Sequence, residues 1–108
     1  MVNPVLLGQV RRKLNITWED DDTTARIEEI IESAIPDLLH RLGIADHDFD
    51  FSVAGDENTL LKNYCLYEWN HCLNDFFLNY SVMIAQVRAR NDVAHYLANK
   101  EVSNNAEN

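Results

Sequence analysis

The stretch from Leu60 to Tyr80, LLKNYCLYEWNHCLNDFFLNY, contains neither glycine nor proline, and its apolar residues recur at the spacing of one helical face. The whole chain of 108 residues has only three glycines and two prolines, too few for a turn-rich all-β fold. A chain of this length forms one domain with one core. We therefore expect an all-α fold: a small bundle of four helices in a single domain at residues 1–98, followed by a polar, flexible tail at residues 99–108.

Capping residues place the first two helices. Asn3 and Pro4 open a short first helix of about three turns, with asparagine as the N-cap and proline in the first turn. A second helix is expected from about residue 23 to residue 42, and Gly43 ends it. Pro36 lies on the polar side of this helix, so we expect a bend there and not a break.

Two further helices are expected after the glycine at position 55. Asp56 is expected to cap the third helix, which runs to about Tyr80, and the fourth helix runs from about Ser81 to about Ala98, with a kink where the two meet. The fourth helix is apolar on two sides, which is more than one monomer core can bury. The first stripe holds Met83, Ile84, Val87, Ala94 and Ala98. The second stripe holds Val82, Ala85, Ala89, Val93 and Leu97.

Two acidic segments raise the possibility of a metal site. The run of four acids at residues 19–22 could bind a cation, but acids before a helix also cap it and favour its positive end, and we prefer this second interpretation. The loop at residues 44–55 has aspartates at the spacing that begins a calcium loop, yet Phe51 stands at the sixth position, where such a loop needs glycine, and the loop contains no glutamate for the twelfth position. We expect a surface loop held in place by Phe49 and Phe51. Its aspartates are Asp46, Asp48 and Asp50.

The charge is strongly acidic and unevenly distributed. The net charge is -9: residues 1–14 carry +3, residues 15–59 carry -11 and residues 60–108 carry -1, which sum to the same total. Such a field repels the phosphate backbone of nucleic acids, so sequence-specific DNA binding is not expected even though an all-α fold would permit it. We find no signal peptide and no stretch apolar enough to span a membrane.

The cysteines Cys65 and Cys72 could in principle serve a metal site or a nucleophile. On one helix their Cα atoms lie about 10 Å apart, too far for a disulfide, and free thiols indicate a reducing, cytosolic setting. Both fall in the apolar arc, whereas His71 lies about 100° away, so one helix cannot gather them with Glu68 around an ion or pair a thiolate with a base. We interpret both as core residues. No enzymatic activity, metal or cofactor is expected.

The polar side of the third helix carries almost no charge, which is unusual in a chain this acidic. Asparagine is a middling helix former, and a solvated face would normally carry Glu, Lys or Gln. Because the centres of protein interfaces are depleted of charge, we favour an interface with another subunit or partner. The alternative is that this side packs inside the monomer against the first helix or the loop. Candidate interface residues are Asn63, Tyr67, Asn70, His71 and Asn74, together with Arg88, Arg90, Val93 and Leu97 of the fourth helix.

Several segments, in their order and spacing, resemble a known family. VRRKLNITWEDDDTTARIEEIIESAIPDLLHRLGI, from Val10 onward, contains a basic helix end and then acids and threonines that open a long helix. NYCLYEWNHCLNDFFLNY then supplies a core helix that ends in phenylalanine and tyrosine. Over about residues 5–90 the chain resembles the small head–tail connector, or adaptor, proteins of tailed bacteriophages and prophages. The resemblance depends on the order and spacing of all these segments together, since no single motif among them is diagnostic.

The resemblance implies a structural role and no catalysis. Members of this family assemble into a ring, typically twelve-fold, under the portal protein in the neck of the virion, after synthesis in the cytoplasm of the bacterial host. The ring extends the DNA channel, lets DNA pass without specific binding, and docks the next head-completion (stopper) protein or tail protein. No membrane contact is implied. The acidic composition leaves a rival class open: a small acidic protein-binding module, such as a DNA-mimicking inhibitor that occupies a basic site.

Overall fold

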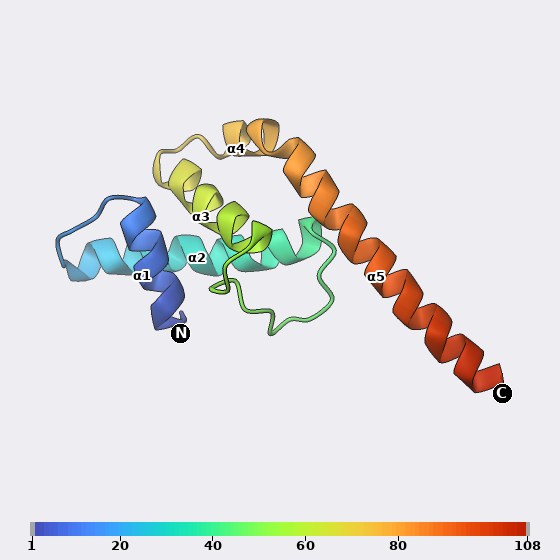
Figure 1. Ribbon diagram of the computed structural model, residues 1–108. Helices are drawn as coiled ribbons and strands as arrows, with labels where there is room; N and C mark the ends of the chain where they lie inside the picture. The colour runs from blue at the N-terminus through green and yellow to red at the C-terminus, as the bar shows by residue number, and fades with distance from the viewer. Residues whose placement is uncertain (1, 108) are drawn as a thin grey trace.

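The computed structural model describes the chain from residue 2 to residue 107, and its side chains as far as Lys100. Over these residues the chain forms five α-helices and no strand (Figure 1). The expected all-α class is therefore confirmed. The expected number of helices is wrong, because the predicted third helix divides into α3 (Asp56–Trp69) and α4 (Leu73–Asn79). Gly55 is the N-cap of α3, so the expected cap Asp56 lies instead in the first turn, where its charge favours the positive end of the helix.

The first helix, α1 (Pro4–Lys13), begins as the sequence predicts. The Asn3 side chain accepts hydrogen bonds from the backbone N–H groups of Val5 at 2.8 Å and Leu6 at 3.4 Å, which satisfies donors that have no partner inside the helix. Leu6 and Val10 are buried in the core. The Asn3 cap thus fixes where the helix starts, and the spacing of Leu6 and Val10 determines which face it buries.

The long helix α2 (Asp21–Arg41) is capped by the acidic run that precedes it. Asp20 is the N-cap, and its carboxylate accepts hydrogen bonds from the Thr23 N–H at 3.2 Å and the Thr23 hydroxyl at 2.9 Å. The capping interpretation of this run is confirmed for Asp20. Pro36 lies inside the helix, which continues past it without a break.

Three helices end in the same way, with a residue of positive φ just past the last turn. In each case two backbone hydrogen bonds close the helix end in the Schellman pattern. At the end of α3, for example, the Cys72 N–H donates to the Tyr67 carbonyl at 2.9 Å. The residues of positive φ are Asn15 at 59°, Gly43 at 65° and His71 at 59°.

The break between α3 and α4 explains why the predicted continuous helix is wrong. Asn70 is the C-cap of α3, and its side chain donates to the Leu66 carbonyl at 2.9 Å. Asparagine favours such helix ends because its amide can satisfy nearby backbone groups. Cys72 consequently lies at the start of α4, half-buried, and not at the centre of an apolar arc as predicted. Cys65 is buried, as expected.

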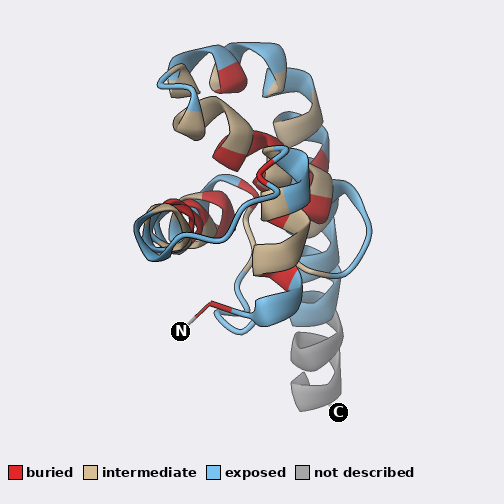
Figure 2. Ribbon diagram, turned by 90° about the vertical axis from the view of Figure 1, so that its left-hand side faces the viewer, coloured by how far each residue is buried: buried red, intermediate tan, exposed pale blue. Residues whose placement is uncertain are grey.

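The core lies between α1, α2 and α3, and the buried residues face inward there (Figure 2). Helix α3 contacts each of the other four helices, which is why it buries residues on several sides. The loop at residues 44–55 is held by Phe51, which is buried, and by Phe49, whose ring centroid lies 5.0 Å from that of Phe51. The predicted role of these two phenylalanines is confirmed. The largest fully buried side chains include Phe51, Phe76, Ile27, Ile31, Leu38, Leu42, Leu60 and Leu61.

The buried thiol of Cys65 should make the fold sensitive to alkali. Burial, with a smaller contribution from Glu68, raises the pKa of this thiol from 9.0 to about 12. In the unfolded chain the thiol ionises near its ordinary value, so the stability that burial of the neutral thiol allows is complete below pH 9 and declines as the pH rises toward 12. We expect a loss of about 1 kcal/mol between pH 9 and pH 10, measured by urea unfolding.

A Cys65→Ala variant is the control for this pH dependence. Its free energy of unfolding should change much less over the same interval, because the titrating group is gone. The nearby Tyr64, whose pKa burial and its hydrogen bond to Asp37 raise above 10.0, contributes mainly above pH 10, and its smaller share between pH 9 and pH 10 is the same in the wild type and the variant. Equal slopes for the wild type and the variant would contradict the assignment to Cys65.

The last helix, α5 (Ser81–Glu107), extends well past its predicted end at Ala98. It starts directly after Tyr80, where the predicted kink is confirmed. Its first half packs against the body through Val87, which is buried, and Ile84, which is partly buried. Its second half leaves the body and points away from it (Figure 1), giving extents of 60 × 29 × 19 Å. This projecting half is the feature of the fold that the sequence indicates least.

Candidate protein-interaction surface

The uncharged polar residues predicted to share one side of the third helix do not form one continuous surface. Asn63 is buried, and its side chain donates to the Thr59 carbonyl of its own helix at 2.9 Å. Asn58, one helical turn and a half earlier, is also buried and joins the loop to α1, donating to the Phe51 carbonyl at 2.7 Å and to the Gln9 side chain at 2.8 Å. At Asn63 the structure favours the alternative of packing inside the monomer, so we omit this residue from the candidate surface.

Tyr67 belongs to an aromatic cluster that joins α3, α4 and the start of α5. Its ring meets those of Phe76 and Tyr80 edge-on, with centroids 5.9 Å and 6.1 Å away. The Tyr67 hydroxyl accepts a hydrogen bond from the Asn79 amide at 3.2 Å. This residue is half-buried, and its contacts stabilise the monomer.

The junction after α3 is clamped to α2 by Arg26. The Arg26 guanidinium donates to the Trp69 carbonyl at 3.1 Å, contacts His71 Nε2 at 3.3 Å, and lies 4.2 Å from the centroid of the Trp69 ring. Asn70 and His71 are exposed but are both used to turn the chain. Asn74 is exposed on α4. These residues therefore form a corner of the molecule and not a face of a helix.

The second apolar stripe of α5 is exposed, as expected for a helix with more apolar surface than the core can bury. Val82 is 68% exposed, Val93 57% and Leu97 54%. Tyr96, which the sequence analysis missed, is 63% exposed and lies on the same side of the helix, about 60° from Val93 at 100° per residue. We call this surface the outer stripe. It consists of Val82, Ala85, Ala89, Val93, Tyr96 and Leu97.

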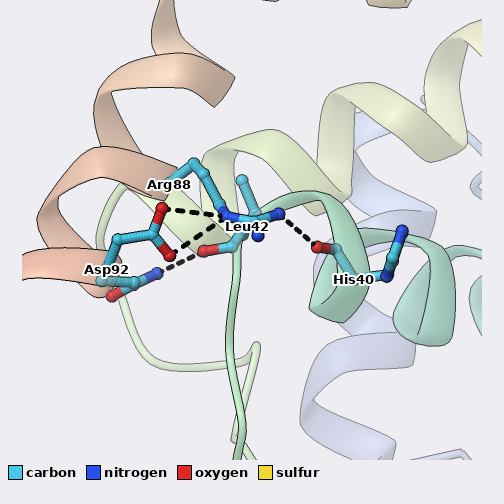
Figure 3. A network of polar contacts seen from close by, with 5 residues as sticks. His40, Leu42, Arg88 and Asp92 are labelled. Atoms are coloured by element: carbon cyan, nitrogen blue, oxygen red, sulfur yellow. Dashed lines mark hydrogen bonds and ion pairs between the residues drawn. The ribbon is translucent and has the colours of Figure 1, made fainter. Parts of the chain in front are cut away.

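Arg88 and Arg90 are both predicted interface residues, but in the structure their side chains contact other helices of their own chain. Figure 3 shows Arg88 between the end of α2 and Asp92: its Nη1 donates to the His40 carbonyl at 3.0 Å, and its Nε lies 3.2 Å from Asp92 Oδ1. Arg90 lies 3.3 Å from Asp56 Oδ2 and also pairs with Glu57, at the start of α3. These contacts join α5 to two other helices and set the direction in which it projects.

The same network closes the end of α2. The Asn91 amide donates to the Leu42 carbonyl at 2.8 Å (Figure 3). The last carbonyls of a helix have no partner within it, and here α5 supplies donors to two of them. The position of α5 is therefore coupled to the end of α2.

A groove of about 420 Å³ opens between the start of α1, the middle of α2 and the loop at residues 44–55. We call it the acidic groove. Its apolar residues are Val2, Leu6, Ile35, Phe49 and Phe51. Its charged residues are Glu32, Asp48 and Asp50, and none of the described residues that line it is a lysine or an arginine. Two hydrogen bonds from Ser52 hold the pKa of Asp50 below 3.8, so this carboxylate is ionised at neutral pH.

The expectation that the calcium-loop pattern lacks a glutamate at its twelfth position is wrong. Counted from Asp46, the twelfth residue is Glu57, which is the residue type that the pattern requires there. In the structure Glu57 lies in the first turn of α3 and pairs with Arg90, while Phe51 at the sixth position is buried. Within the described residues no group of three or more His, Cys, Asp or Glu side chains is placed to hold a metal ion.

Comparisons with known proteins do not place this chain in a family. No family model, curated protein or solved structure matches the chain. None of the described helices is both long enough and apolar enough to cross a membrane. The candidate surface that results consists of the outer stripe of α5, the acidic groove, and the corner at Asn70, His71 and Asn74.

Proposed function

We propose that this protein is a structural adaptor of a phage or prophage head–tail connector, which assembles as a ring below the portal protein. The observation that carries the proposal is the projecting half of α5 with its exposed outer stripe. A helix that leaves a small body and exposes Val93, Tyr96 and Leu97 has apolar surface that the monomer does not bury. The resemblance of residues 5–90 to connector proteins supplies the class of partner.

Ring assembly needs two different surfaces on each subunit, because each copy meets one neighbour on each side. The outer stripe and the corner at Asn70, His71 and Asn74 are two such surfaces on different parts of the molecule. The acidic segment of residues 15–59 supports a further part of the proposal: a channel wall of like charge would let DNA slide through without holding it. The adaptor then extends the DNA channel and docks a stopper or tail protein.

The test of this function is an electron-microscopy experiment that mixes the protein with a portal protein, which we expect to be encoded near it. We expect rings of the adaptor stacked on portal rings, and neighbouring genes for capsid and tail components. A purified protein that binds no portal, from a gene without such neighbours, would overturn the proposal.

The acidic exposed face of α2 favours a second candidate, an acidic module that binds a basic site on another protein. Asp21, Asp22 and Glu29 are all exposed on this helix and lie outside the acidic groove. Such a module would compete with DNA for a DNA-binding enzyme and would lose this activity when these acids are replaced by glutamine or asparagine. Portal binding, in contrast, should tolerate the loss of some of these charges, so one set of variants separates the two candidates.

A further inference from the structure

The acidic groove has an apolar floor that the chain leaves partly open. Val2, Leu6 and Phe51 line it and are buried, whereas Ile35 and Phe49 line it and are only partly buried. Its volume of about 420 Å³ falls within the range of pockets that hold ligands in proteins. An apolar side chain from outside that covers Ile35 and Phe49 would therefore remove apolar surface from water and favour binding.

Three carboxylates lie along this floor, and none of the described residues that line the groove supplies a cation to them. Glu32, Asp48 and Asp50 are all exposed. Like charges gathered along one groove repel one another, and a cationic side chain from a partner would offset this repulsion. The ion pairs among the described residues use other carboxylates, those of Asp37, Asp56, Glu57 and Asp92.

The loop holds two of these carboxylates in place before a partner binds. The Asp48 N–H donates to the Asp46 side chain at 2.9 Å. Asp50 Oδ1 accepts hydrogen bonds from the Ser52 N–H at 2.9 Å and from the Ser52 hydroxyl at 2.5 Å, which leaves Oδ2 for another donor. Burial of Phe51 holds the loop against the body. Because the groove is preorganised, a partner does not have to order it on binding.

The two segments of the chain that carry exposed cations and apolar residues fit this groove poorly. The basic cluster at residues 11–13 ends α1, and the adjacent Val10 is already buried in the core. In α5, residues 93–107 carry one lysine and two glutamates and are net negative. The charge and the apolar floor together therefore select a segment of a different protein.

We propose that the acidic groove binds a basic, apolar segment of a partner protein. Lysine or arginine side chains of the segment lie at Glu32, Asp48 and Asp50, and an apolar side chain between them covers Ile35 and Phe49. This inference rests on the proposed adaptor function, because it names the chemistry of the protein that the adaptor docks. The charges set the orientation and specificity of the segment, and the apolar contact anchors it.

The experiment selects short random peptides on the immobilised full chain, in the presence of a metal chelator. We expect the recovered peptides to carry lysine or arginine on both sides of a leucine, isoleucine or phenylalanine. Glu32→Lys with Asp48→Lys is the groove variant. Glu19→Lys with Glu29→Lys is the matched control, because it makes the same change of charge outside the groove. All four residues are exposed, so both variants should keep the thermal midpoint of the wild type.

Fluorescence anisotropy with synthetic copies of the recovered peptides measures the two parts of the contact. Affinity should fall at least about tenfold for the groove variant and less than about twofold for the control. Serine in place of the peptide's apolar residue should also weaken binding at least about tenfold. A peptide in which glutamate replaces the basic residues should bind the groove variant more tightly than it binds the wild type.

Other results overturn the inference. Recovery of no peptide, or of peptides without basic residues, would show that the groove does not select this chemistry. Equal losses for the groove variant and the control would show that peptides bind the general acidity of the chain, and unchanged binding of the serine peptide would exclude the apolar anchor. Self-association of the wild type that the groove variant loses, seen by sedimentation velocity, would show that a second copy occupies the groove.

The portal experiment is separate from this one. A chain that forms rings on the portal but recovers no basic, apolar peptide keeps the adaptor function and loses this contact. A chain that recovers such peptides through its groove but does not bind the portal refutes the adaptor function and keeps the groove as a site for basic segments.

Discussion

Replacing Phe76 with alanine is expected to lower the free energy of unfolding by about 3–5 kcal/mol, the largest effect of any single change proposed for this protein. The Phe76 side chain is fully buried. Its ring centroid lies 5.1 Å from that of Tyr80, against which it stacks, and 5.4 Å from those of Tyr64 and Phe77. The substitution removes the transfer energy of the ring and leaves a cavity among aromatic neighbours that cannot close it.

The Phe76→Ala substitution should also disrupt the structure locally, at helix α4. Helix α4 has seven residues, too few to be stable as a helix without packing, and Phe76 is its buried anchor. We expect the thermal midpoint to fall by more than about 10 °C and near-ultraviolet circular dichroism to weaken. Leu78→Ala on the same helix is the control, because Leu78 is 74% exposed and its truncation should cost less than about 0.5 kcal/mol. Similar losses for the two variants would show that Phe76 is not the anchor.

Replacing Gly43 with alanine should destabilise the fold by about 2 kcal/mol through two separate effects. Gly43 has a φ of 65°, a left-handed conformation in which a Cβ costs about 1–2 kcal/mol. A Cβ there would also lie 2.8 Å from both Cδ and Nε of Arg88 and 3.1 Å from Asp92 Oδ1. Arg88 would have to move away, and its hydrogen bond to the His40 carbonyl would be lost or distorted. Chemical unfolding of the Gly43→Ala variant measures the sum of the backbone cost and the cost of displacing Arg88.

Two further variants separate these effects. Gly8→Ala is the matched control: the added Cβ would meet only the tip of Arg12, at 3.5 Å, inside α1, so alanine should stabilise the helix by up to about 1 kcal/mol. In an Arg88→Ala background, Gly43→Ala should cost little more than the backbone share, because the two contacts at 2.8 Å are gone and only the exposed Asp92 side chain, with Oδ1 at 3.1 Å, has to shift. An unchanged cost in that background would contradict the role assigned to Arg88 at the base of α5.

The residues that set helix ends could be found in the sequence with good accuracy wherever the signal was local. Asn3 caps α1, Asp20 caps α2, and Gly43 follows the end of α2, all as capping rules predict. The prediction of one continuous third helix is wrong because asparagine serves both helix ends and polar faces. Its low helix propensity was the available signal, and the structure uses Asn70 to end α3.

The candidate surface could be predicted only in part. The second stripe of α5 was expected to exceed what the core can bury, and Val82, Val93 and Leu97 are indeed exposed. The acidic groove could not be predicted, because its residues come from three segments that only the fold brings together. Whether an arginine on a helix meets another protein or its own chain also depends on such distant neighbours, and Arg88 and Arg90 both found partners within the monomer.

The sequence by itself determined that this chain is helical, where α1 and α2 begin and end, where α5 begins, and that α5 carries more apolar surface than one core needs. These properties depend on residues a few positions apart, and local spacing records them directly. The tertiary structure decided that Asn63 is buried, that α3 and α4 are separate, and that α5 projects from the body. Each of these depends on contacts between segments far apart in the chain, such as Arg26 with Trp69 or Arg88 with His40, which no periodicity records.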